Sequence, residues 1–194
     1  MLINCPPPNY TGGERGFAAV PGLQDRFRRD FMKTMRVAEH LKLQFIHIMA
    51  GVADGPAARD AFVENLTWAT AQAADQMLTI EPINQTDMPG NFLSDFDEAA
   101  AILAKVAAPN LHLQYDAYHV QMITGDALAV WAKLGHLAKH VQVGGVPGRH
   151  ETNKCDIDYP AFFAMLDTQE YDGFVSGEYN PANRTENDLN WIKT

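Results

Sequence analysis

The residues best suited to chemistry in this chain are polar side chains that directly follow short apolar runs. Four such positions recur, each after a run with the composition of a buried strand: Glu81, Asp116, Gln142 and Glu178. Because parallel strands of α/β proteins end at one edge of the sheet, and catalytic groups gather there, we expect these side chains to converge. Three carboxylates at such close range would repel one another unless they shared protons or bound a cation. The all-oxygen donor set favours a hard divalent ion, Mg²⁺ or Mn²⁺, whereas zinc normally recruits several His or Cys.

Each of these residues also has a purely structural interpretation. An acidic residue after a strand is often a helix N-cap or a solvated loop charge. Recurrence at successive strand ends favours a shared site over four independent caps. His119, three residues after Asp116, has both a structural and a functional interpretation on its own.

The elements that must position these residues alternate along the chain. Apolar runs predict strands over residues 2–5, 45–49, 78–83, 111–118, 140–143 and 174–179. Helical spacing and caps predict helices over residues 25–43, 56–74, 95–106, 126–137, 159–166 and 185–192. This alternation predicts an α/β fold of one domain, 1–194, in which helices cover a parallel sheet. A G-x-G-x-x-G after the first strand, which would favour a dinucleotide fold, is absent. A closed (β/α) barrel needs eight βα units, and this chain offers six, so we expect an incomplete barrel.

Composition and charge restrict the function classes. The net charge of −9 over 194 residues argues against nucleic-acid binding, which needs a basic surface. No apolar run reaches the roughly 18 residues of a membrane span, so we expect no membrane partner. The N-terminus lacks the basic start of a signal peptide, and Cys5 and Cys155 suit free thiols in a reducing compartment, so we expect a cytoplasmic protein.

Several sequence segments together resemble a known family. They read I-E-P-I-N at 80–84, D-M-P-G at 87–90, Q-Y-D-A-Y-H at 114–119, H-V-Q-V at 140–143, P-G-R-H-E at 147–151 and G-E-Y at 177–179. In these segments the chain resembles the hydroxypyruvate isomerase family, within the xylose isomerase-like TIM-barrel superfamily. The resemblance covers nearly the whole chain, although residues 2–5 match the family's third strand, so we expect the first two βα units to be missing.

The resemblance implies a role for each polar residue. Glu81 and Glu178 would transfer protons, and these two with Asp116 and Gln142 would hold the divalent metal. The substrate would contact His47, His119 and Arg149, and Arg149 would bind the carboxylate of the substrate. A metal would polarise the carbonyl of a short hydroxy/oxo acid, and the two glutamates would interconvert hydroxypyruvate and tartronate semialdehyde through an enediolate.

The sequence leaves several alternatives open. The same chemistry suits a 2-oxo-tetronate isomerase or a ketose 3-epimerase. A related abasic-site endonuclease would need a His-rich zinc cluster and a basic surface, and the chain is acidic. An incomplete barrel could also be an inactive isoform that acts only as a binding partner, and its two open sheet edges favour a homo-oligomer.

Overall fold

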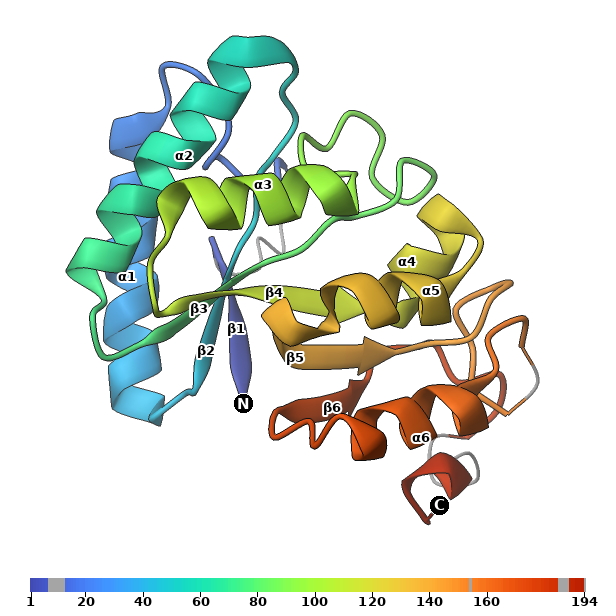
Figure 1. Cartoon of the computed structure of the whole chain (residues 1–194). Helices are drawn as coiled ribbons and strands as arrows, with labels where there is room; N and C mark the ends of the chain where they lie inside the picture. The colour runs from blue at the N-terminus through green and yellow to red at the C-terminus, as the bar shows by residue number, and fades with distance from the viewer. Residues whose placement is uncertain (7–12, 154, 185–188, 194) are drawn as a thin grey trace. The chain divides into compact units, whose positions relative to one another are not determined.

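A computed structural model of the chain describes residues 1–6, 13–153, 155–184 and 189–193 (Figure 1). The chain forms two compact units, Met1–Gln114 and Tyr115–Thr194. Among the described residues, no helix combines the length and the hydropathy that a membrane crossing requires.

The first unit contains parallel strands that pair in chain order. They are β1 (Leu2–Cys5), β2 (Phe45–Ile48), β3 (Met77–Ile80) and the first residues of β4 (Leu111–Asp116). The helices of this unit are α1 (Gln24–Leu41), α2 (Gly55–Gln72) and α3 (Phe96–Val106). Helix α2 packs between α1 and α3, as Figure 1 shows. Each strand is therefore followed by a helix, as predicted.

Local sequence explains where these helices begin and which face they bury. Helix α1, which was predicted from helical spacing, buries one face that includes Phe27, Phe31 and Met35. Leu41, the last residue of α1, is 57% exposed. Asp95 caps α3 as predicted, since its side chain accepts a hydrogen bond from the backbone N–H of Glu98 at 2.7 Å.

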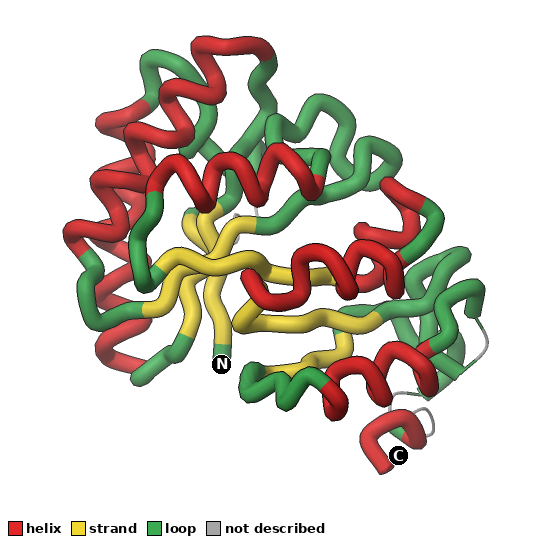
Figure 2. The backbone as a smooth tube through the Cα atoms, in the orientation of Figure 1, coloured by secondary structure: helices red, strands yellow, loops and turns green. Residues whose placement is uncertain are grey.

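The second unit continues the same alternation. It contains the parallel strands β5 (Ala138–Val143) and β6 (Phe174–Gly177). Its helices are α4 (Ala117–Thr124), α5 (Ala127–Leu134) and α6 (Tyr159–Thr168), with short 3₁₀ turns η1 (Gly135–Leu137) and η3 (Asn190–Lys193) (Figure 2). Its core is aromatic: the Trp131 ring meets Tyr115 at 5.0 Å and Phe162 at 5.4 Å between centroids.

The structure corrects the predicted elements at several boundaries. The predicted strand over 111–118 ends at Asp116, and the unpredicted helix α4 follows at once. The predicted strands over 78–83 and 174–179 are also shorter, so that Glu81 and Glu178 lie directly after β3 and β6. The predicted helix over 185–192 falls partly outside the described residues, and 190–193 form the 3₁₀ turn η3 instead.

Candidate functional site

Glu81 and His47 are neighbours in the first unit. The Nε2 atom of His47, in β2, lies 3.7 Å from Oε2 of Glu81, just after β3. Both side chains are buried, and Nδ1 of His47 contacts Oδ1 of Asn4 in β1 at 3.1 Å. The predicted catalytic Glu81 and the predicted substrate-binding His47 therefore share one buried, polar strand end.

The segment after Glu81 is a turn held by its own side chains. Oδ1 of Asn84 accepts hydrogen bonds from the backbone N–H groups of Thr86 at 3.0 Å and Asp87 at 2.9 Å. The Asn84 amide also donates to the Asp87 carboxylate at 3.1 Å. The residues of the I-E-P-I-N and D-M-P-G segments thus fix the loop that begins at Glu81, which gives much of this motif a positioning role.

Asp116 is the centre of the second unit's polar cluster. Its side chain has no exposed surface, and its Oδ1 accepts a hydrogen bond from the N–H of Tyr118 at 2.9 Å. Its Oδ2 lies 2.6 Å from Nη2 of Arg149 and 3.6 Å from Nε2 of His119. One oxygen therefore caps α4 while the other faces two groups that the sequence assigned to the substrate.

Arg149 links Asp116 to Glu178. The same Nη2 atom lies 3.2 Å from Oε2 of Glu178, and Nε of Arg149 donates to the backbone carbonyl of Glu178 at 3.2 Å. The guanidinium also lies over the Tyr118 ring, 4.8 Å from its centroid. The structure thus brings together Asp116, His119, Arg149 and Glu178, all predicted site residues of this unit.

Both carboxylates of this cluster have raised pKa values. Desolvation raises the pKa of Asp116, while the guanidinium of Arg149 and the N–H of Tyr118 oppose the shift. The pKa of Glu178 is also raised, first by desolvation and then by the Asp116 carboxylate, although 47% of its side chain is exposed. Two carboxylates with raised pKa values that share one positive group form an oxygen-donor set that a hard divalent ion fits.

Gln142 completes the predicted oxygen set of the second unit. It lies in β5, is buried, and pairs in register with Ser176 of β6, two residues before Glu178. Its position near the carboxyl end of β5 agrees with the sequence prediction. Arg149 contacts Asp116 and Glu178, and Asp116 lies next to His119, while a ligand role for Gln142 stays a prediction.

The loop that carries Arg149 is fixed by residues that the sequence did not identify as functional. The hydroxyl of Tyr159 accepts from the N–H of Gly144 at 2.9 Å and donates to its carbonyl at 2.8 Å. The buried Glu151 accepts from the N–H of Ala182 at 2.7 Å, which joins this loop to the segment after β6. Glu151 stood within the P-G-R-H-E motif, whereas nothing in the sequence pointed to Tyr159.

Known proteins are similar to this chain over nearly its whole length. Residues 3–194 match the family model described as xylose isomerase-like TIM barrel. A 2-oxo-tetronate isomerase of Cupriavidus necator is 40% identical, over 99% of this chain and 76% of the relative. A hydroxypyruvate isomerase of Escherichia coli is 33% identical, over 98% of this chain and 76% of the relative.

A solved structure gives the same answer for the fold. The crystal structure of a protein from Brucella melitensis, named AP endonuclease, family 2, superposes with a TM-score of 0.93. It is 34% identical and covers 99% of this chain and 76% of its own. The predicted TIM-barrel type of α/β fold, with six parallel strands and helices between them, is therefore confirmed.

Proposed function

The chain belongs to the xylose isomerase-like TIM barrel family, and its relatives from Cupriavidus necator and Escherichia coli are named isomerases, so we propose that it interconverts hydroxypyruvate and tartronate semialdehyde. The observation that supports this proposal most is the buried Asp116 carboxylate, grouped with Glu178, His119 and Arg149 after the strands of the second unit. A 2-oxo-tetronate substrate, one carbon longer, is the second candidate, favoured by the identity to the Cupriavidus relative.

A divalent ion, Mg²⁺ or Mn²⁺, is the cofactor we propose. Glu81, Asp116, Gln142 and Glu178 would hold it through oxygen atoms. When bound, such an ion supplies polarisation of the substrate carbonyl and makes the neighbouring C–H more acidic. We assign the substrate's oxygens to His119 and His47, whose buried imidazoles lie next to Asp116 and Glu81.

Two proton transfers complete the proposed reaction. One of Glu81 and Glu178 takes a proton from the hydroxymethyl carbon of hydroxypyruvate, and an enediolate forms. The other glutamate returns a proton to the adjacent carbon. As the original hydroxyl oxygen becomes the aldehyde, its proton passes to His119, and His119 gives a proton to the oxygen that becomes the alcohol. Arg149 suits the substrate carboxylate, since a guanidinium binds carboxylates through two parallel hydrogen bonds.

Replacing either glutamate tests the proposal. We expect Glu81→Gln and Glu178→Gln each to lower kcat on hydroxypyruvate by at least roughly 10²–10⁴-fold, the usual contribution of a general acid–base group. The matched control is Glu98→Gln, which removes an exposed carboxylate that pairs with Arg59 on the surface of the first unit. Turnover is measured on hydroxypyruvate and 2-oxo-tetronate with Mn²⁺ present.

The outcomes separate the alternatives. Turnover by wild type and Glu98→Gln, with loss in both site variants, supports the two-glutamate scheme. Normal turnover in either site variant would contradict it. A wild-type chain that unfolds cooperatively but turns over neither substrate would favour the reading of an inactive binding partner.

A further inference from the structure

The guanidinium of Arg149 lies between two carboxylates of the second unit. Its Nη2 atom lies 2.6 Å from Oδ2 of Asp116 and 3.2 Å from Oε2 of Glu178, both proposed metal ligands. We propose that the Arg149 guanidinium balances the charge of these two carboxylates and that a divalent ion bound by them displaces it. This inference rests on the proposed function, because it concerns the same oxygen ligands.

The guanidinium and the metal compete for the same oxygen atoms. A small divalent ion binds carboxylate oxygens at roughly 2.1 Å, directly on the lone pairs that the guanidinium uses. Two cations at such a distance from the same oxygen repel one another strongly in a buried site. Since Oδ1 of Asp116 already accepts the N–H of Tyr118, Oδ2 is the oxygen for which both cations compete.

The structure allows the guanidinium to leave while its backbone stays in place. The carbonyl of Arg149 accepts the N–H of Asn180 at 2.8 Å, and its φ of 53° is in the left-handed region, so the loop conformation is well defined there. The side chain is 22% exposed, which gives it a path towards solvent. Its stacking on Tyr118 and its bond to the Glu178 carbonyl hold the guanidinium close to the cluster.

Displacement would free Arg149 from Asp116 and Glu178 and so allow it to bind the substrate carboxylate. A guanidinium that is paired with Asp116 and Glu178 has few donors left for a substrate carboxylate. Once released, it is a nearby, partly desolvated donor for that carboxylate. Metal loading should therefore strengthen the binding of a small carboxylate, and by linkage the carboxylate should strengthen metal binding equally.

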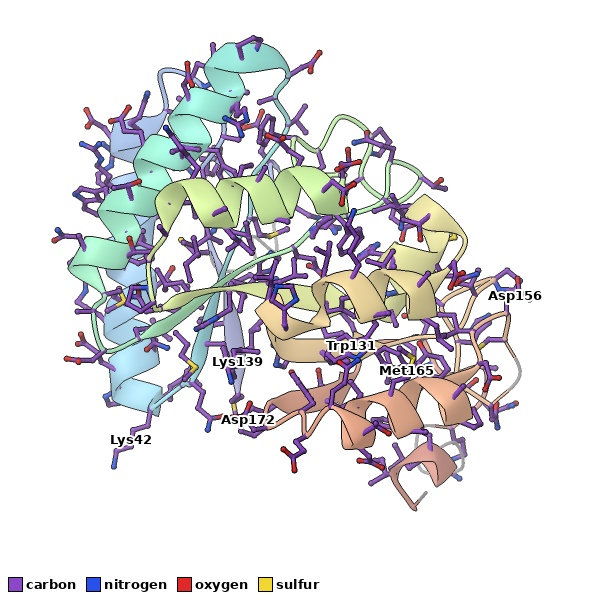
Figure 3. The ribbon with its side chains drawn as sticks, in the orientation of Figure 1. Lys42, Trp131, Lys139, Asp156, Met165 and Asp172 are labelled. Atoms are coloured by element: carbon purple, nitrogen blue, oxygen red, sulfur yellow. The ribbon has the colours of Figure 1, made fainter. Side chains whose placement is uncertain are left out.

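The experiment measures binding of Mn²⁺ alone to the full chain by titration calorimetry. We expect R149Q to bind Mn²⁺ roughly tenfold more tightly than wild type, within the usual range for coupled binding. The matched control is K139Q, because Lys139 pairs with Asp172 at 2.6 Å on the surface. Figure 3 shows these two residues at one end of the second unit and Asp156, in the loop that carries Arg149, at the other. K139Q should change the Mn²⁺ affinity by less than about twofold, since surface ion pairs contribute little.

A second measurement uses the wild-type chain and needs no variant. Phenylglyoxal modifies accessible guanidinium groups, and mass spectrometry reads the modified fraction of Arg149. Saturating Mn²⁺ should accelerate modification of Arg149 and leave Arg59, which pairs with Glu98 in the first unit, unchanged.

The outcomes distinguish this inference from the proposed function. Tighter Mn²⁺ binding by R149Q alone, with faster labelling of Arg149, supports displacement. Displacement would be overturned if the wild type binds Mn²⁺ and R149Q binds it equally or more weakly. It would also be overturned if Mn²⁺ slows the labelling of Arg149. In both cases the proposed metal centre would still stand. Failure of the wild-type chain to bind Mn²⁺ would overturn the proposed metal centre itself.

Discussion

Asp116 shows at the scale of one residue why this cluster is more than structural support. A fully buried carboxylate is expensive to desolvate, and a buried ion pair often stabilises a fold no more than apolar side chains of the same size. The capping bond to Tyr118 needs only one oxygen, and Asn or Ser would serve as well. The second oxygen faces Arg149 and His119, which agrees with the metal-ligand role that we propose for Asp116.

His140 predicts a pH dependence of stability in the same unit. Burial lowers the pKa of its imidazole from 6.5 to about 4, and the ring contacts the hydroxyl of Ser176 at 3.1 Å. Between these two pKa values the unfolded chain binds a proton that the folded chain does not. The free energy of unfolding is therefore unaffected by protonation of His140 above pH 6.5. As the pH falls from 6.5 towards 4, it decreases by up to about 3 kcal/mol.

Urea unfolding at a series of pH values measures this effect. His140→Gln should unfold with a shallower loss of free energy between pH 6.5 and 4 than the wild type does. His136→Gln, which removes an exposed imidazole from η1, controls for the loss of a His as such. Equal slopes for wild type and His140→Gln would contradict the prediction.

The sequence predicted the strand-end residues because their signal is local. An apolar run followed by one polar residue identified Asp116 and Glu178, and the structure places both near Arg149. The pairing itself was not predictable, since Arg149 lies 33 residues from Asp116 in the chain and reaches it through an irregular loop. The sequence suggested a substrate role for Arg149, whereas the structure shows it paired with the proposed metal ligands.

At the scale of elements, helix α4 was not predicted because its residue types do not favour a helix. Its sequence, A-Y-H-V-Q-M-I-T, contains β-branched and aromatic residues that favour strands. Its two ends determine it instead: Asp116 caps the start, and Gly125 ends it with a φ of 78°. This correction matters for the site, because it places His119 in the first turn of a helix rather than just beyond the end of a strand.

Gly125 offers a direct test of how α4 ends. An added Cβ would meet nothing within 4 Å, so any cost of substitution comes from the backbone conformation alone. Gly125→Ala should lower the free energy of unfolding by about 1 kcal/mol, because alanine rarely adopts a positive φ. Gly125→Asn should cost less, since asparagine tolerates this conformation. Denaturant unfolding that ranks the two variants in the opposite order would contradict this account.

At the scale of the whole molecule, the class of fold was predictable and its details were not. The alternation of short apolar runs with helical spacing is a property of the full sequence, and it predicted six strands that the structure confirms. Strand ends and the last helix depended on caps and contacts that periodicity does not contain. Cys5 and Cys155 are free thiols, as expected, while a cytoplasmic location stays a prediction.

The charge of the whole chain predicts weak DNA binding, which bears on the endonuclease activity named for the Brucella structure. Fifteen Lys and Arg against 24 Asp and Glu give a net charge of −9, whereas DNA affinity comes from cations that release phosphate counterions. We therefore expect no measurable binding of an abasic duplex below about 100 µM at 150 mM salt, weaker than the usual non-specific range. Fluorescence anisotropy of a labelled duplex measures this, with an intact duplex of the same sequence as the control. Micromolar affinity specific to the abasic site, together with strand cleavage, would contradict the isomerase proposal. The carboxylate centre would then act in phosphodiester hydrolysis instead.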